Sequence, residues 1–338
     1  MVNYYINIII FFSALLCNYL AMKYGLFFTT KSKKQIQNIH IVETPRIGGL
    51  IIFIHFFFYI YFFEKNLIFI FLISLLFLMP AFYEDLNYSI QPLIRLILIF
   101  TGSLLIILNL ESLPQFQFIF NSLLNNNYFQ IIFFTICLAT VINGQNIIDG
   151  TNGLSALTGI SIFGSLLYIG LYVNDHQLIN ISIIIINLLI CFLLFNYPFG
   201  RIFLGDCGSY FIGLLGGYLT IYTFGKYPEL PSWSAIVVLY YPCQEVVFSY
   251  FRKIINKTSP FAADNLHLHL KIFYLIQSNK TNSKLFNALV APFLSILWIS
   301  PLALIPFAIQ NHLLAILAVI LLSFIYVFLY LSIPEPKK

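Results

Sequence analysis

The sequence predicts an all-α fold: a polytopic bundle of transmembrane helices. Of the 338 residues, 60% are hydrophobic and only 9% are charged, whereas an ordinary soluble domain carries about 25% charged residues. The hydrophobic residues form eleven segments, each near the roughly 20 residues that span the hydrocarbon of a bilayer. Because irregular backbone exposed to lipid is excluded, these segments are expected to pack into one bundle. No domain boundary is evident, which predicts a single domain over residues 1–338.

The predicted spans are taken in chain order. They cover residues 3–23, 47–63, 67–83, 93–110, 128–145, 154–174, 178–197, 209–225, 232–251, 285–306 and 312–332. The first segment is too long for a signal peptide and lacks a cleavage site of small residues, so we expect it to remain in the protein. Pro242 predicts a break in the ninth helix, close to Glu245, which is the only acid well inside a span.

The positive charges predict the orientation of the bundle. In this arrangement fifteen of the seventeen Lys and Arg residues lie on one face, and only Lys65 and Lys226 lie opposite. The positive-inside rule then places the amino terminus outside and the carboxyl terminus in the cytoplasm. The net charge of +5 requires no nucleic-acid partner, and the five cysteines show neither disulfide nor zinc-site spacing.

Five polar segments interrupt the hydrophobic ones, and each follows an odd-numbered span. They are therefore expected to share the cytoplasmic face. Carboxylates, amides and histidines at membrane depth are costly and by default indicate function. These segments are Glu43–Leu50, Glu84-Asp85, Asn143–Leu154, Phe203–Gly213 and Ser259–Leu270. Their convergence predicts an active site at the membrane surface.

The segment Asn143–Leu154 combines amides, a carboxylate and glycines. Asn143, Asn146 and Asp149 are spaced by three, so they share one face if the fifth helix continues through them. Such a face can bind a hard cation, and the glycines after it let phosphate oxygens approach the main chain. The alternative is simple helix capping at a membrane boundary.

Asp206 lies between two glycines just before the eighth span. Ser209 is in a position to cap that helix, which would leave backbone amides free to face an anion. Asp206 as a cap is the simpler alternative. Mg²⁺ takes one or two protein oxygens together with phosphates and waters, and Asp206 with Asn146 or Asp149 supplies that set.

Two further groups carry charge or histidine. Glu84 and Asp85 are adjacent carboxylates, which attract a cation or a proton. The alternative is a solvated pair in a loop. Arg95 either extends its side chain to the lipid headgroups or holds a phosphate. His267 and His269 differ by two, whereas zinc pairs on helices favour four. With Asp264 and Arg252 nearby, we expect them to contact a diphosphate or sugar.

Taken in order, these segments resemble the polyprenyl-phosphate N-acetylhexosamine-1-phosphate transferases, the MraY/WecA superfamily of glycosyltransferase family 4 type. The resemblance covers nearly the whole chain. It implies transfer of a HexNAc-1-phosphate from a UDP-N-acetylhexosamine to a polyprenyl (undecaprenyl) phosphate, with release of UMP and a requirement for Mg²⁺. It implies metal ligands Asn146 and Asp206, and it matches Glu84, Asp85 and Asp149 to the acidic positions of the family and His267 and His269 to its histidine-rich loop. We therefore expect catalytic roles for Glu84, Asp85 and Asp149. We expect substrate contacts from Asn143, Asn152, Arg95, Arg252, His267 and His269.

Three departures bear on the branch of the superfamily. Glu84 and Asn152 stand where Asp is usual or frequent, and Leu270 stands where the histidine-rich loop ends in His. The HLHL pattern favours the enzymes that initiate O-antigen, capsule or teichoic-acid glycans. The alternative is the phospho-N-acetylmuramoyl-pentapeptide transferase of peptidoglycan synthesis. Either implies a bacterial inner-membrane enzyme embedded in the lipid bilayer, with a cytoplasmic active site, and a homodimer is compatible with both.

The chemistry expected from these residues is a single displacement on phosphorus. A phosphate monoester is largely dianionic at pH 7, so the main obstacle is bringing anions together, which Mg²⁺ and the basic residues would relieve. A two-step route through an aspartyl-phosphate is the alternative. Two other classes compete with this prediction: a multi-pass transporter and a membrane-bound acyltransferase. Neither the donor sugar nor the polyprenol length follows from the sequence.

Overall fold

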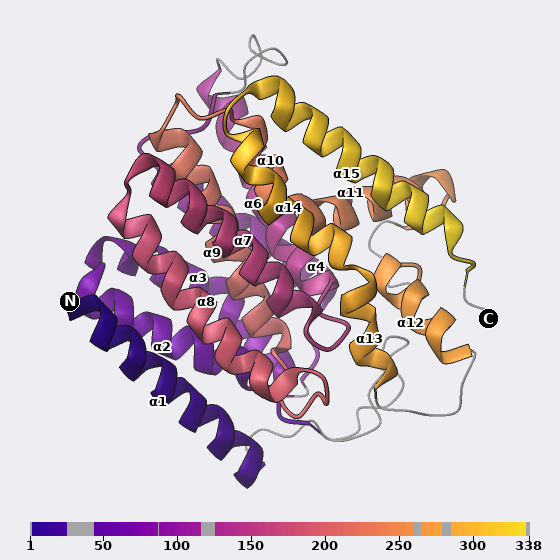
Figure 1. Ribbon diagram of the computed structural model, residues 1–338, viewed down its shortest axis with the longest axis horizontal. Helices are drawn as coiled ribbons and strands as arrows, with labels where there is room; N and C mark the ends of the chain where they lie inside the picture. The colour runs from indigo at the N-terminus through magenta and orange to yellow at the C-terminus, as the bar shows by residue number, and fades with distance from the viewer. Residues whose placement is uncertain are drawn as a thin grey trace.

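The computed structural model describes residues 2–25, 44–86, 88–115, 126–259, 265–278 and 285–335. Within these ranges the chain is helical and contains no strand (Figure 1). The all-α prediction is therefore confirmed. Glu43 and Asp264, which the sequence placed in two of the polar segments, lie outside the described residues.

Apart from α12, which lies between the ninth and tenth predicted spans, the described helices follow the predicted hydrophobic segments in order. They are α1 (Val2–Tyr24), α2 (Gly48–Phe63), the 3₁₀ helix η1 (Lys65–Leu67), α3 (Ile68–Asp85), α4 (Pro92–Leu108), α6 (Asn127–Ile147), α7 (Leu154–Val173), α8 (His176–Asn196), α9 (Gly205–Lys226), α10 (Trp233–Val238), α11 (Tyr240–Ile255), α12 (Leu268–Ser278), α13 (Phe286–Phe293), α14 (Ser295–Ala308) and α15 (His312–Ser332).

Seven of these helices or helix pairs are long and apolar enough to cross a membrane: α1, η1 with α3, α6, α7, α8, α13 with α14, and α15. The predicted second and fourth spans are shorter apolar helices, α2 with 16 residues and α4 with 17. The eighth is α9, and the ninth is divided between α10 and α11. The predicted number of eleven spans, the sides of the membrane on which the termini lie and the single domain therefore stay predictions.

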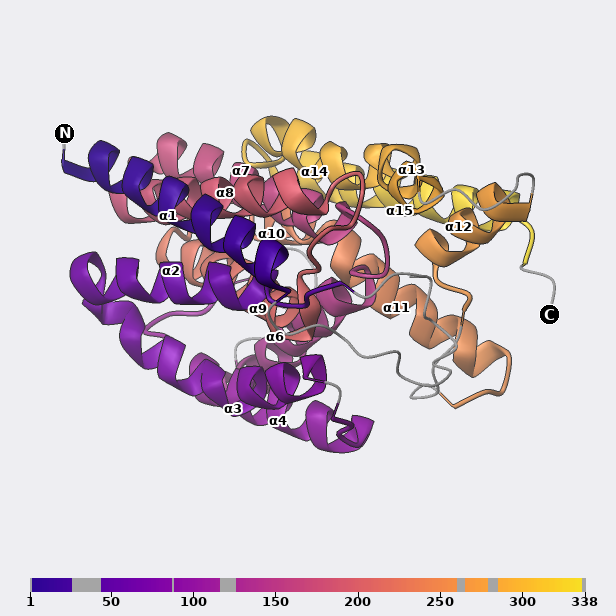
Figure 2. The same ribbon diagram turned by 90° about the horizontal axis from the view of Figure 1, so that it is seen from below.

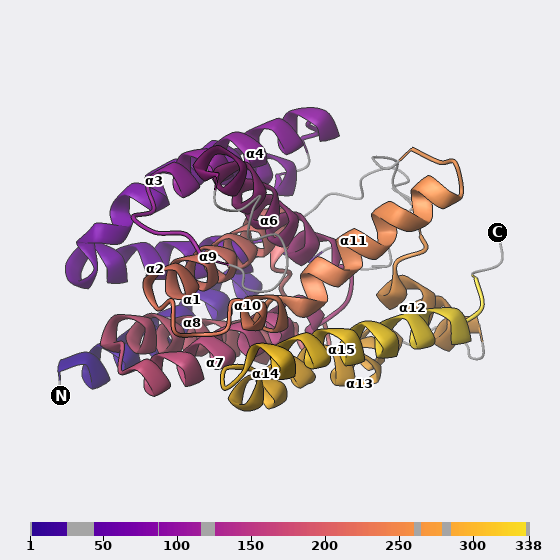
Figure 3. The same ribbon diagram turned by 90° about the horizontal axis from the view of Figure 1, so that it is seen from above.

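The predicted break in the ninth helix is confirmed at Leu239, between α10 and α11. Pro242 lies in the first turn of α11, where a missing backbone N–H costs no helical hydrogen bond. Beyond the break, α11 extends outward from the centre of the bundle on the side where α12 and the carboxyl terminus lie, and its far end diverges from α15 (Figures 2 and 3).

The centre of the bundle is formed by α6 and α9, which pack against each other. In Figure 2, α3 and α4 lie side by side at one edge, whereas α7, α14 and α15 lie at the other. Nearly every residue of α9 is buried. A Cβ atom on Gly144 of α6 would lie 2.2 Å from the carbonyl oxygen of Pro242, so α6 and α11 touch backbone to backbone. This packing brings the end of α6 and the starts of α9 and α11 together.

A short extended pairing joins two of the polar segments. Phe203 N donates to Pro45 O at 2.8 Å, and Gly48 N donates back to Phe203 O at 3.0 Å. Gly49 N continues the pairing by donating to the next carbonyl, that of Leu204, at 2.9 Å. The segment that precedes α2 is therefore fixed beside the start of α9.

Candidate active site

Asn146 and Asp206, the predicted metal ligands, are in direct contact. Asn146 lies in the last turn of α6 and Asp206 in the first turn of α9. Asn146 Nδ2 donates to Asp206 Oδ1 at 3.0 Å and to Ser209 Oγ at 2.9 Å. The two side chains are 60 residues apart in sequence, and helix packing brings them to one place.

Asp85 caps the amino terminus of α9. Its side chain is buried, and its two oxygens accept from the backbone N–H groups of Asp206 at 2.9 Å and Cys207 at 3.0 Å. A carboxylate at this position satisfies amides that have no partner within the helix and complements the helix dipole. Gly205 makes room for it, since its φ is +79° and a Cβ atom there would lie 2.6 Å from Asp85 Oδ2.

The prediction that Ser209 caps the eighth span is therefore wrong. The helix begins at Gly205, before Ser209, and a carboxylate from α3 takes its first amides. Ser209 Oγ instead donates to Asp206 O at 3.1 Å and accepts from Asn146. Its side chain thus supports the contact between the predicted metal ligands.

Glu84 and Arg95 form an ion pair beside Asp206. Arg95 Nη1 lies 2.8 Å from Glu84 Oε2 and 3.5 Å from Asp206 Oδ2. Glu84 Oε1 accepts from Ile90 N at 3.2 Å. Glu84 and Asp85 are therefore not a solvated loop pair, and Arg95 is turned toward carboxylates. We call Glu84, Asp85, Arg95, Asn146 and Asp206 the acidic cluster.

Asp149 borders the acidic cluster but does not continue the helical face. Helix α6 ends at Ile147, and Asp149 lies in the following turn, where its N–H donates to Asn146 O at 3.1 Å. Burial raises the pKa of Asp149 well above its usual value, and the carboxylates of Asp206 and Asp85 raise it further, while Arg46 opposes the rise. Asp149 therefore responds to the charge of the acidic cluster.

Asn143 lies on α6, one turn before Asn146. Its Nδ2 donates to the carbonyl oxygen of Ala139 in its own helix at 2.9 Å. The predicted role of Asn143 in substrate binding stays a prediction.

The two predicted histidines are buried around Glu245, a residue of α11. Glu245 Oε1 lies 2.9 Å from His267 Nδ1 and accepts from Leu268 N at 3.2 Å. Glu245 Oε2 accepts from Tyr326 OH at 2.9 Å, so one carboxylate joins α11, α12 and α15. The ring of His269 stacks on that of His267, with centroids 5.9 Å apart. We call Glu245, His267, His269 and Tyr326 the histidine cluster.

The histidine cluster reaches the acidic cluster through Gly150. A Cβ atom on Gly150 would lie 2.7 Å from His269 Nε2, so this ring packs against the residue that follows Asp149. Burial lowers the pKa of His269 to about 4, which outweighs the opposing effect of Glu245. His269 is therefore neutral at pH 7 and offers a hydrogen bond without a positive charge.

Arg252 and Asn152, both predicted to contact substrate, are held by the protein itself. Arg252 donates from Nη1 to Leu266 O at 2.8 Å and to Tyr330 OH at 3.1 Å. Asn152 is buried, and its Nδ2 donates to Pro198 O at 2.9 Å. The structure therefore groups most of the predicted site residues into two adjoining clusters and places Asn152 in a neighbouring turn.

Glu245 and Arg46 were not among the predicted catalytic, substrate-binding and metal-binding residues. For Glu245 the available signal was an acid inside a hydrophobic span after a proline. For Arg46 the signal was its position within a polar segment, although nothing in that segment distinguished it from a topology-setting charge. Only the packing shows that both lie beside predicted site residues.

The acidic cluster contains oxygen ligands that could hold a hard divalent cation. Asn146 and Asp206 present an amide and a carboxylate in contact, and the Asp206 side chain is 29% exposed. Within the described residues, no group of three or more His, Cys, Asp or Glu side chains is arranged to hold a metal. A site with few protein ligands suits Mg²⁺, which fills its remaining positions with water and phosphate oxygens.

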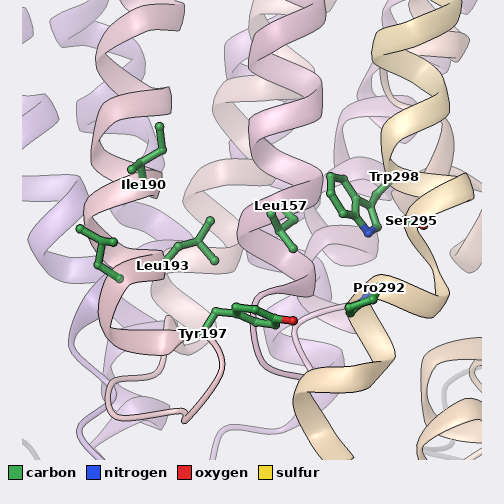
Figure 4. Close-up of a pocket in the computed structure, with 8 residues that line it drawn as sticks. Leu157, Ile190, Leu193, Tyr197, Pro292, Ser295 and Trp298 are labelled. Carbon is green, nitrogen blue, oxygen red and sulfur yellow. The ribbon is translucent and has the colours of Figure 1, made fainter. Parts of the chain in front are cut away.

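The described chain also contains an apolar pocket of about 550 Å³. Figure 4 shows side chains of α7, α8, α13 and α14 facing it, among them Leu157, Leu193 and Trp298. Its lining includes no carboxylate, histidine or basic residue. Catalytic chemistry of the kind expected here requires charged groups, so we assign the candidate active site to the two polar clusters and not to this pocket.

Comparison with known proteins places these clusters in a family context. The model of the family described as Glycosyl transferase family 4 matches residues 67–224. That segment contains the whole acidic cluster, whereas the histidine cluster lies after it.

Curated relatives match similar parts of the chain. It is 36% identical over 138 residues to the undecaprenyl-phosphate alpha-N-acetylglucosaminyl 1-phosphate transferase of Thermotoga maritima, which covers 41% of each protein. It is 30% identical over 137 residues to a probable undecaprenyl-phosphate N-acetylglucosaminyl 1-phosphate transferase of Bacillus subtilis, covering 39% of this chain and 37% of that protein. A phospho-N-acetylmuramoyl-pentapeptide-transferase of Leuconostoc citreum is 28% identical over 145 residues, covering 40% of this chain and 43% of its own length.

The matched segments thus span about two fifths of the length of these relatives. Together, the family match over residues 67–224 and the names of these relatives confirm that the chain resembles the superfamily of polyprenyl-phosphate N-acetylhexosamine-1-phosphate transferases.

Proposed function

We propose that the protein transfers a HexNAc-1-phosphate from a UDP-sugar to a polyprenyl (undecaprenyl) phosphate, releasing UMP. The observation that supports this most strongly is the contact of Asn146 with Asp206 at 3.0 Å, beside Arg95 and the buried Asp85. The names of the relatives supply the class of acceptor and donor. The product would be a lipid diphosphate sugar that initiates a cell-surface glycan.

Asp206 and the side-chain oxygen of Asn146 would hold Mg²⁺, which when bound supplies positive charge that offsets the negative charge of the diphosphate. Arg95 lies 3.5 Å from Asp206 and adds a positive group at the same place. Guanidinium groups bind phosphate oxygens in a planar, two-point geometry. The acidic cluster would therefore orient the donor diphosphate.

The proposed reaction is a single displacement. An oxygen of the acceptor phosphate attacks the β-phosphorus of the UDP-sugar, the bond from that phosphorus to the bridging oxygen breaks, and UMP leaves with that oxygen. Glu84 would orient the acceptor phosphate and take its residual proton, because both oxygens of Asp85 already accept backbone N–H groups. Asp85 then acts by fixing α9, and Asp149 helps to hold the nucleotide or metal.

The experiment that tests this function incubates the purified protein and undecaprenyl phosphate with a panel of UDP-HexNAc donors and measures UMP. We expect one donor to yield UMP and an equal amount of lipid product, with loss of the reaction in EDTA and recovery on adding Mg²⁺. A reaction indifferent to EDTA would contradict the metal assignment. Solute flux into proteoliposomes with no UMP release would favour a transporter.

A second candidate is the phospho-N-acetylmuramoyl-pentapeptide transferase reaction, which the Leuconostoc citreum relative carries in its name. Including UDP-N-acetylmuramoyl-pentapeptide among the donors separates the two. The HLHL sequence around His267 and His269 favours a donor without the peptide. We place the reaction on the cytoplasmic face of a bacterial inner membrane, because that face carries most of the Lys and Arg residues.

A further inference from the structure

Arg46 lies beside the acidic cluster but before the segment that the family matches. The extended pairing of Pro45 and Gly48 with Phe203 fixes the backbone on both sides of it. Phe203 precedes Asp206 by three residues, so Arg46 is held near the start of α9, which carries the candidate metal ligand. The backbone position of Arg46 is therefore fixed by hydrogen bonds of its neighbours and does not depend on the Arg46 side chain.

Arg46 is half-buried. The described part of the chain offers it no hydrogen-bond partner and no carboxylate within ion-pair distance. It nevertheless lies close enough to Asp149 to oppose the rise in the pKa of that carboxyl. Arg95, in contrast, is bound to Glu84 at 2.8 Å.

Arg46 is partly exposed, so water binds its guanidinium donors until a ligand replaces that water. The N–H donors of a guanidinium lie in one plane and match the oxygens of a phosphate. The free donors of Arg46 therefore suit a phosphate ligand.

We propose that Arg46 is a substrate-binding residue whose guanidinium binds a phosphate group of one of the two substrates. This inference rests on the proposed transferase function. The phosphate belongs either to the diphosphate of the nucleotide sugar or to the polyprenyl phosphate, and separate measurements of the two Michaelis constants distinguish these sources.

The test compares Arg46→Gln with wild type and with Arg201→Gln as a matched control. Arg201 lies five residues before Asp206 and is exposed, and its guanidinium carbon lies 5.4 Å from the centre of the Phe199 ring. We expect Arg46→Gln to raise the KM for one substrate by about 10- to 100-fold, as is typical of a lost charge-assisted hydrogen bond. Arg201→Gln should leave both KM values within about twofold.

A binding readout separates this inference from the proposed function. The thermal shift produced by UDP or by inorganic pyrophosphate is measured for wild type and Arg46→Gln. If wild type releases no UMP from any donor, the proposed function fails, while weaker binding of these anions to Arg46→Gln still supports a phosphate site. Unchanged KM values for both substrates with unchanged anion binding would overturn the inference.

Two further results decide the remaining cases. An equal rise in KM in Arg201→Gln would overturn the inference, because the effect would then depend on the net charge of this end of the bundle and not on Arg46 itself. If Arg46→Gln does not fold, Arg46→Met keeps the apolar stem of the side chain and is judged by the same measurements.

Discussion

Asp206 combines two roles in one residue. Its backbone N–H is held by Asp85, and its side chain accepts from Asn146 while lying 3.5 Å from Arg95. Arg95 lies closer to Glu84, at 2.8 Å, than to Asp206, at 3.5 Å. A carboxylate held in a fixed geometry is the kind of ligand that a hard divalent cation binds.

Asp206→Asn is expected to abolish transfer while the protein still inserts and folds. The variant keeps the size of the side chain and the backbone cap but removes the charge. We expect UMP release to fall by more than about 100-fold, beyond the 10- to 100-fold loss typical of residues that only orient a metal ligand. Glu111→Gln, at an exposed acid far along the chain, is the control and should retain activity. Activity of Asp206→Asn near wild type would refute the metal assignment.

The buried ring of His269 predicts that the folded protein loses stability at low pH. Its pKa of about 4 lies below the usual value of 6.5 because the ring is buried. Below pH 6.5 the unfolded state therefore binds more protons at this ring than the folded state does. The stability that the neutral ring contributes is fully present above pH 6.5 and is lost as the pH falls through 4. The free energy of unfolding is expected to fall by about 3 kcal/mol over this pH range.

Melting temperatures measured between pH 7 and pH 4 check this prediction. Wild type should lose stability steeply, and His269→Gln should show a shallower dependence. His55→Gln is the control, because the ring of His55 bonds only to Ile51 O in its own helix. An identical pH dependence in wild type and His269→Gln would contradict the assignment of this effect to His269.

Among the elements, α11 is the connection between the two clusters. Gly144 lets it touch α6, and Glu245 on its buried face joins it to α12 and α15. A polar network at such a junction fixes one arrangement of helices, since each group in it would be costly to bury alone. The break at Leu239 directs α11 toward this junction.

Glu245→Ala is expected to destabilise the protein by about 3 kcal/mol or more, because His267, Leu268 N and Tyr326 all lose a buried partner. Tyr326→Phe removes one of these hydrogen bonds and should cost about 1 kcal/mol. Denaturant or thermal unfolding in detergent measures both. Equal stability of the two variants would show that the carboxylate does not hold this junction together.

Across the whole molecule, hydrophobic length predicted where helices lie, and the proline predicted where one breaks. These features are local, because each depends on a continuous stretch of sequence. The cap formed by Asp85 on α9 was not predictable, since it joins groups 121 residues apart in the chain. The same holds for Glu245 and His267, whose contact depends on how α11 packs. The sequence indicated which polar residues lie in or beside hydrophobic spans, where burying them is costly. Tertiary packing determines which of these residues are in contact.

The length of α9 and the distribution of positive charge together predict the orientation of the protein in the membrane. Helix α9 has 22 residues and is about 33 Å long, so Arg201 before it and Glu229 after it lie at opposite ends of the bundle. The positive-inside rule predicts that Arg201 and the acidic cluster face the cytoplasm.

In a cysteine-free background, Arg201→Cys should react with a membrane-impermeant maleimide in inside-out vesicles only. Glu229→Cys, which replaces another exposed residue, should react in right-side-out vesicles only. Labelling of Arg201→Cys in right-side-out vesicles would place the acidic cluster on the outer side of the membrane, away from nucleotide sugars in the cytoplasm. The proposed donor could then not reach Asp206, and the transferase function would fail on topology alone, whatever the geometry of the cluster.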